Sequence, residues 1–133
     1  MKYQILDHTG DLRIIVYGRS YKELFQNALY GMADCIIKIK NDFTDSERSI
    51  KIKKNSYEDL LISFLSEALY ELEINRVLYY KSDLEINDME LNGIIKGFYL
   101  KGDIEYEYII KAVTYYDLEI RPEDGFLKIV FDI

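Results

Sequence analysis

The segment from Ser56 to Leu72 is the feature that most restricts how this chain can fold. It opens with S-Y-E-D, a spacing at which the serine side chain caps a helix and carboxylates follow in the first turn. Apolar residues then recur at intervals of three and four along about four turns: Leu60, Leu61, Phe64, Leu65, Ala68, Leu69 and Leu72. Such an apolar stripe has to be covered by another layer of structure.

Runs with an apolar period of two supply that layer, because this period is typical of strands. Four of them follow the helix, and the third is long enough to be interrupted: residues 77–86, 91–100, 106–120 and 126–131. Three more strands are predicted upstream, at residues 3–6, 12–17 and 50–52. S-Y-K-E at residues 20–23 opens the other amphipathic helix of the chain.

This order of elements is not the regular alternation of strand and helix that builds a doubly wound fold. A chain of 133 residues is also of the commonest size for one domain. We therefore predict an α+β fold in a single domain, residues 1–133, with a mixed, largely antiparallel sheet and two helices packed on one of its faces.

Composition excludes several classes of site and partner. The one cysteine, Cys35, rules out an internal disulfide and a zinc site of several thiolates, and we expect it to be a buried thiol. The net charge of -7 disfavours tight direct binding of RNA or DNA and suits a cation or a basic protein partner. No stretch reads as a signal peptide or reaches the ~18 apolar residues of a membrane span. We expect a cytoplasmic protein without membrane contact.

The chain has none of the short motifs of nucleotide-binding or hydrolytic enzymes, and its chemistry lies in carboxylates near its two ends. Asp7 and Asp11 flank the turn D-H-T-G-D, and Asp132 and the terminal carboxylate of Ile133 follow the last strand. These hard oxygen ligands favour Ca²⁺, Mg²⁺ or Mn²⁺. The same residues also fit a plain structural reading, in which Asp7 and Asp11 cap a turn and Asp132 is a solvated strand end.

Four separated motifs resemble the archease family: D-H-T-G-D-L-R-I-I-V-Y-G at residues 7–18, the S-Y-K-E-L-F-Q-N-A helix, K-A-V-T-Y-Y-D-L-E-I at residues 111–120, and the final V-F-D-I. The resemblance covers almost the whole chain. It implies a small acidic cofactor of an RtcB-type RNA ligase, which joins RNA ends in tRNA splicing and RNA repair. In that family the cofactor promotes guanylylation of the ligase and multiple turnover without catalysing a reaction itself. It meets RNA only through the ligase, and no DNA is expected.

The resemblance also implies roles for individual residues. Asp11, Asp132 and Ile133 match the positions of a metal site. Lys111 matches a functional lysine, and Asp7 falls where the family carries an acidic residue; with His8 they are supporting or partner-contacting residues.

This sequence departs from the family pattern at three positions near these residues. Gly10 stands where alanine is usual, Arg13 where glycine is common, and Tyr116 where a histidine is frequent.

Two other readings remain open. An independent metal-dependent phosphoesterase would also use acidic ligands, although it ordinarily needs a base or a second metal beside its substrate. A chaperone-like binding module would need no metal at all. Incubating the purified chain with a cyclic-phosphate RNA and Mn²⁺ separates the enzyme from the ligase cofactor.

Overall fold

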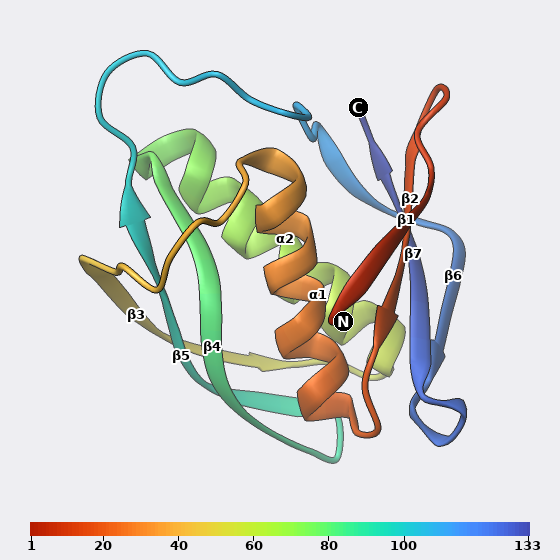
Figure 1. Ribbon diagram of the computed structural model, residues 1–133. Helices are drawn as coiled ribbons and strands as arrows, with labels where there is room; N and C mark the ends of the chain where they lie inside the picture. The colour runs from red at the N-terminus through yellow and green to blue at the C-terminus, as the bar shows by residue number, and fades with distance from the viewer.

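Strand pairing divides the protein into two antiparallel sheets (Figure 1). The computed structural model describes residues 1–133. The four-stranded sheet has the order β1-β2-β7-β6, with β1 at Tyr3–Asp7, β2 at Leu12–Tyr17, β7 at Phe126–Asp132 and β6 at Ala112–Arg121. The three-stranded sheet has the order β3-β5-β4, with β3 at Ser46–Lys53, β5 at Glu90–Tyr99 and β4 at Val77–Asn87.

The two helices lie between these sheets, as Figure 1 shows. Helix α1 (Tyr21–Ile36) packs against β4 on one side and β2 on the other, and α2 (Tyr57–Asn75) packs against β4 and β6. The α+β class, the antiparallel pairing and the two helices are confirmed. The strands form two sheets where the sequence analysis expected one, because each helix buries apolar residues toward both sides.

Both helices begin with the serine cap that the sequence predicts. The Ser20 Oγ accepts a hydrogen bond from the Glu23 N–H at 3.1 Å, and the Ser56 Oγ accepts one from the Asp59 N–H at 3.0 Å. The first residues of the two helices, Tyr21 and Tyr57, stack with ring centroids 3.7 Å apart. The two helices therefore start side by side.

Two tight turns connect neighbouring strands. Asp88 and Met89 both have positive φ (49° and 61°), which is the geometry of a two-residue turn between β4 and β5. A 3₁₀ turn at Pro122–Asp124 leads to Gly125, whose φ of 84° favours glycine, and so joins β6 to β7.

Residues 100–111, here called the crossover segment, lead from one sheet to the other. The sequence analysis placed a strand from residue 106, and this was wrong for residues 106–111, because β6 begins only at Ala112. The reason is visible in the hydrogen bonds. The N–H groups of Glu107 and Tyr108 donate to the carbonyl oxygens of Ile36 (2.9 Å) and Cys35 (3.1 Å) at the end of α1. The segment thus satisfies helix carbonyls in place of a strand partner.

One hydrophobic core joins both sheets and both helices. Phe25, Phe64 and Phe131 are among its largest fully buried side chains. Cys35 is a buried free thiol, as predicted, and burial raises its pKa to about 11. Neither helix is long and apolar enough to cross a membrane.

Candidate metal and partner-binding site

The ends of three neighbouring strands bring the predicted site residues together. Leu12 of β2 lies opposite Phe131 of β7, so Asp11 and Asp132 each stand one position beyond that pair. Lys111 immediately precedes β6, and its N–H donates to the carbonyl oxygen of Asp132 at 2.7 Å. Asp11, Lys111 and Asp132 therefore lie at the same end of the four-stranded sheet. Ile133 follows them and packs partly buried against the core.

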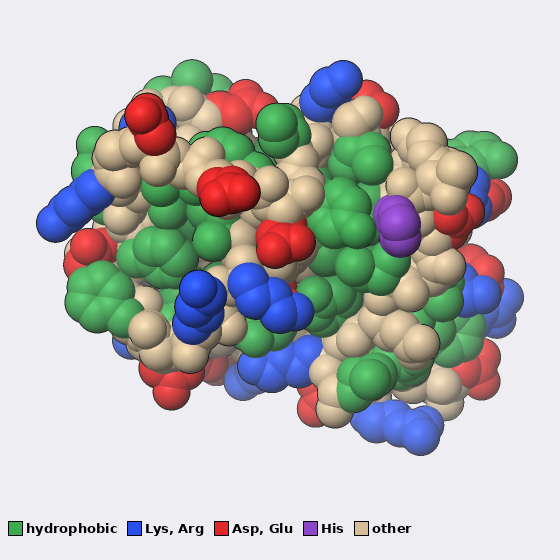
Figure 2. All heavy atoms as spheres, turned by 45° about the horizontal axis from the view of Figure 1, so that its top comes forward, with side chains coloured by type: hydrophobic (Ala, Val, Ile, Leu, Met, Phe, Trp, Pro, Cys, Tyr) green, Lys and Arg blue, Asp and Glu red, His purple; other side chains and the backbone are tan.

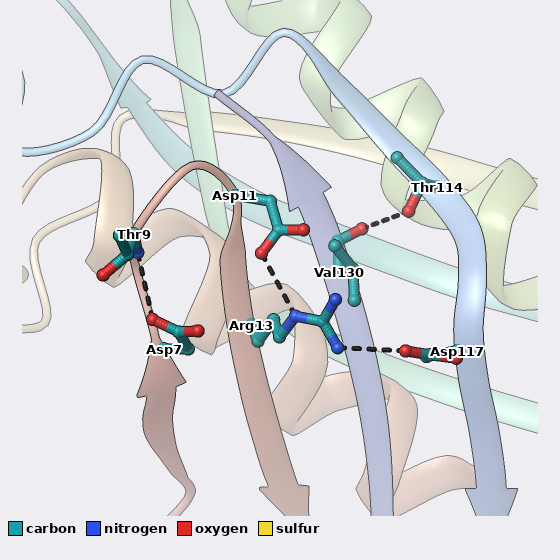
Figure 3. Close-up of polar contacts among 7 residues, drawn as sticks. All are labelled: Asp7, Thr9, Asp11, Arg13, Thr114, Asp117 and Val130. Carbon is teal, nitrogen blue, oxygen red and sulfur yellow. Dashed lines mark hydrogen bonds and ion pairs between the residues drawn. The ribbon is translucent and has the colours of Figure 1, made fainter.

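Strand alternation explains how the two carboxylates share one face. Leu12 and Phe131 are fully buried, so their side chains point toward the helices. Neighbouring residues along a strand point to opposite faces, which sends Asp11 and Asp132 to the outer face of the sheet. Figure 3 shows the Asp11 carboxylate at the start of β2 turned toward β7. Its side chain is 34% exposed, so a ligand can approach from solvent.

Arg13 is a member of this site that sequence reasoning missed. Its Nε lies 3.1 Å from the Asp11 Oδ1, and its guanidinium reaches the Asp117 Oδ2 at 3.0 Å (Figure 3). The guanidinium also lies 5.2 Å from the centre of the Tyr116 ring. The hydrogen bond with Asp117, followed by that with Asp11, raises the pKa of Arg13 above its usual value. The available signal was the period of two, which places residues 11 and 13 on one face of a strand.

An irregularity in β6 brings Asp117 within reach of Arg13. The register of β6 against β7 shifts between Thr114 and Glu119, and Asp117 has a φ of 50°. Aspartate tolerates this left-handed conformation better than most residues. On the near side of the bulge the Thr114 hydroxyl donates to the carbonyl oxygen of Val130 at 2.7 Å (Figure 3). The bulge therefore directs a carboxylate back across the outer face of the sheet.

Asp7 is the last residue of β1, His8 follows it in the turn to β2, and both make other contacts. The Asp7 Oδ1 accepts a hydrogen bond from the Thr9 N–H at 3.0 Å (Figure 3), and this bond lowers the pKa of Asp7. His8 is exposed, with its ring centre 6.2 Å from that of Tyr108 in the crossover segment. Figure 2 shows hydrophobic side chains along one side of the chain's one histidine. Asp7 thus shapes the turn, and His8 borders an apolar surface.

The donor chemistry of the site suits a hard divalent cation that keeps several waters. Carboxylate oxygens of Asp11 and Asp132 and main-chain oxygens of Ile133 are ligands of the type that Ca²⁺, Mg²⁺ and Mn²⁺ take. No group of three or more His, Cys, Asp or Glu side chains is placed to hold a metal ion. The set here includes only two such side chains, so water would have to complete the coordination. One oxygen of Asp11 is already engaged by Arg13.

Comparison with known proteins gives a consistent family. Residues 3–133 match the model of the Archease protein family. The chain is 38% identical over 133 residues to a protein named archease from Thermoplasma acidophilum, covering 100% of this chain and 94% of that protein. It is 37% identical to the Thermoplasma volcanium protein of the same name, covering 100% of both.

Two solved structures share the fold. The solution structure of a Methanobacterium thermoautotrophicum protein aligns with a TM-score of 0.78 at 24% identity, covering 99% of both chains. The crystal structure of a Thermotoga maritima protein, described as an archease and "possible chaperone", aligns with a TM-score of 0.65 at 22% identity, covering 98% of this chain and 96% of that one. At these identities the likeness concerns the fold.

Proposed function

The chain belongs to the archease family, and from this premise we propose that it is a cytoplasmic protein cofactor of an RtcB-type RNA ligase. In this role it promotes guanylylation of the ligase by GTP and lets the ligase turn over repeatedly in tRNA splicing and RNA repair. It catalyses no reaction itself, and it meets RNA only through the ligase.

The observation that supports this proposal most is the meeting of Asp11, Lys111 and Asp132 at one end of the four-stranded sheet. These residues come from three separate strand ends, and β2–β7 pairing and the Lys111–Asp132 hydrogen bond place them side by side. A plain turn-capping role for the aspartates would not require this convergence. The outer face on which Asp11 and Asp132 lie is open to a protein partner.

Each residue has a distinct part in the proposed site. Asp11 and Asp132 offer carboxylate oxygens, and Ile133 offers main-chain oxygens, to a divalent ion such as Ca²⁺, Mg²⁺ or Mn²⁺. Such an ion supplies positive charge that can balance phosphate groups of the ligase's reactants. Lys111 cannot be a ligand while protonated, so it acts electrostatically on a carboxylate or on an acidic or phosphate group of the partner. Asp7 at the end of β1 and His8 in the adjacent turn are supporting or contacting residues.

The test is a turnover count with a purified RtcB-type ligase, GTP, Mn²⁺ and an RNA ending in a 2′,3′-cyclic phosphate. Adding the wild-type chain should convert a single round of joining into many rounds. Asp132→Asn should abolish this stimulation, since the amide keeps the size of the side chain but loses its charge. Asp124→Asn is the matched control, because Asp124 lies in the turn at the other end of β6.

Two outcomes of this assay would contradict the proposal. The first is a folded Asp132→Asn variant that stimulates the ligase as well as the wild type. The second is processing of the cyclic-phosphate RNA by the chain alone, without ligase, which would favour an independent phosphoesterase.

A chaperone-like binding module is the second candidate, and exposed apolar side chains favour it. Ile109 of the crossover segment is 66% exposed and Ile74 near the end of α2 is 59% exposed. The Thermotoga maritima relative carries the description "possible chaperone". In this case the chain should suppress aggregation of an unrelated, thermally unfolded protein, and Ile109→Ser should lose that effect while Asp132→Asn keeps it.

A further inference from the structure

The Arg13 guanidinium pairs with the Asp11 carboxylate, which is also a ligand in the proposed metal site. It contacts Asp11 through Nε and Asp117 through its terminal nitrogen, with 3.1 Å and 3.0 Å between the paired atoms. The side chain thus reaches from β2, across β7, to the bulge of β6 (Figure 3). A positive charge already balances Asp11 in the metal-free protein.

We propose that Arg13 is a built-in competitor of the divalent cation, and that metal binding at Asp11 requires its guanidinium to shift onto Asp117 and Tyr116. This inference rests on the proposed metal site. It adds that Arg13 and Asp117 set the affinity of that site, although neither is a ligand.

The exposure of the three side chains makes this exchange feasible. Arg13 is 32% exposed, Asp11 34% and Asp117 58%. Ion pairs this open to solvent are weak and are broken easily by a divalent ion. After losing Asp11 the guanidinium still has a carboxylate at 3.0 Å and an aromatic ring at 5.2 Å. The guanidinium can therefore keep these two contacts and stay on the surface of the sheet.

Calorimetric titration of the purified chain with Mn²⁺ measures the affinity of the site for the ion, and so the competition by Arg13. Arg13→Gln should bind Mn²⁺ about threefold to tenfold more tightly, because a competing ion pair and a nearby like charge are both removed. The control is Arg121→Gln. Arg121 makes similar ion pairs with Glu119 and Asp124 at the far end of β6. Its replacement by glutamine also makes the same change in net charge. It should leave the affinity unchanged.

A double-mutant cycle tests the part assigned to Asp117. Asp117→Asn removes the second carboxylate that pairs with the Arg13 guanidinium and should weaken Mn²⁺ binding by about twofold to threefold. The same change in the Arg13→Gln background should have much less effect, because no guanidinium remains to be relocated. Asp124→Asn measures how much of the loss comes from net charge alone.

A second readout does not depend on affinity. The Nε–H resonance of Arg13 should shift when diamagnetic Mg²⁺ is added, while those of Arg48 and Arg121, away from the site, stay in place.

If the wild type binds metal and Arg13→Gln binds it equally well, Arg13 is no competitor, although the metal site stands. Equal effects of Asp117→Asn in both backgrounds would overturn the role of Asp117. If no variant binds metal, the inference and the proposed metal site both fail.

Discussion

Replacing Asp34 with alanine should destabilise the protein by about 2–4 kcal/mol and loosen the hairpin that carries Asp11. Asp34 is only 6% exposed, near the end of α1. Its carboxylate accepts hydrogen bonds from the Tyr3 hydroxyl at 2.7 Å and from the Ile39 N–H at 2.8 Å. Through Tyr3 it fastens β1, and so the β1–β2 hairpin, to the helix.

The magnitude follows from what the substitution leaves behind. Each hydrogen bond to a charged acceptor contributes roughly 1.5–3 kcal/mol, and alanine removes the acceptor of two donors. Part of this loss is offset because the buried carboxylate no longer has to be desolvated. The ion pair with Lys38 adds little, since the Lys38 side chain is 65% exposed. The sum of these effects is about 2–4 kcal/mol.

Urea unfolding followed by circular dichroism measures this change. With a slope near 2 kcal/mol per M, the midpoint should fall by about 1–2 M for Asp34→Ala. Asp83→Ala is the matched control, because the Asp83 side chain is 89% exposed and meets only Lys22, and its midpoint should barely move. If both variants unfold at the same urea concentration, Asp34 does not fasten β1 to α1 and this reasoning is refuted.

Three further predictions use other parts of the structure. Burial, with the hydrogen bond to Asp34, raises the pKa of Tyr3. The stability that this shift contributes is complete below the pKa of tyrosine in the unfolded chain, near 10, and is lost as the pH rises above that pKa. Urea midpoints measured from pH 9 to 11 should therefore fall less steeply for Tyr3→Phe than for the wild type. Lys111→Ala should reduce stimulation of the ligase more than it reduces Mn²⁺ affinity; calorimetry beside the turnover assay checks this, and lost affinity with normal stimulation would reverse the assignment. Cys35, 2% exposed and with a pKa raised to about 11, should resist Ellman's reagent at pH 8 until the protein unfolds, and rapid labelling of the native protein would contradict its burial.

Local patterns predicted the elements of this fold better than their arrangement. Serine caps and apolar stripes located both helices, and short apolar runs located five of the seven strands to within one residue at each end. The run expected at residues 50–52 is only part of the longer β3, Ser46–Lys53. The division into two sheets did not follow, because a strand pattern does not name its partner. The crossover segment carries the same pattern at Y-E-Y-I-I, yet its N–H groups bond to the end of α1. Only the packed structure decides between these partners.

The sequence predicted the carboxylates of the candidate site but not the part played by the Arg13 guanidinium. Asp11 and Asp132 were singled out by residue type and by resemblance, and strand register places them together. Arg13 was noted only as a departure from the family pattern. Its ion pairs were not predicted, because its second partner, Asp117, lies far along the chain and reaches it only through a bulge. Asp34 escaped notice because a single carboxylate among apolar helix residues is indistinguishable, in sequence, from an exposed one.

The pairing of β2 with β7 also has a consequence in time. This ladder joins strands from near the two ends of the chain, and contacts so distant in sequence form slowly because a long loop must close first. During synthesis, the helices and the three-stranded sheet can form while β7 is still inside the ribosome. The outer face bearing Asp11 and Asp132 therefore comes into existence as one of the last steps of folding, and an incomplete nascent chain lacks the site that we propose for the ligase.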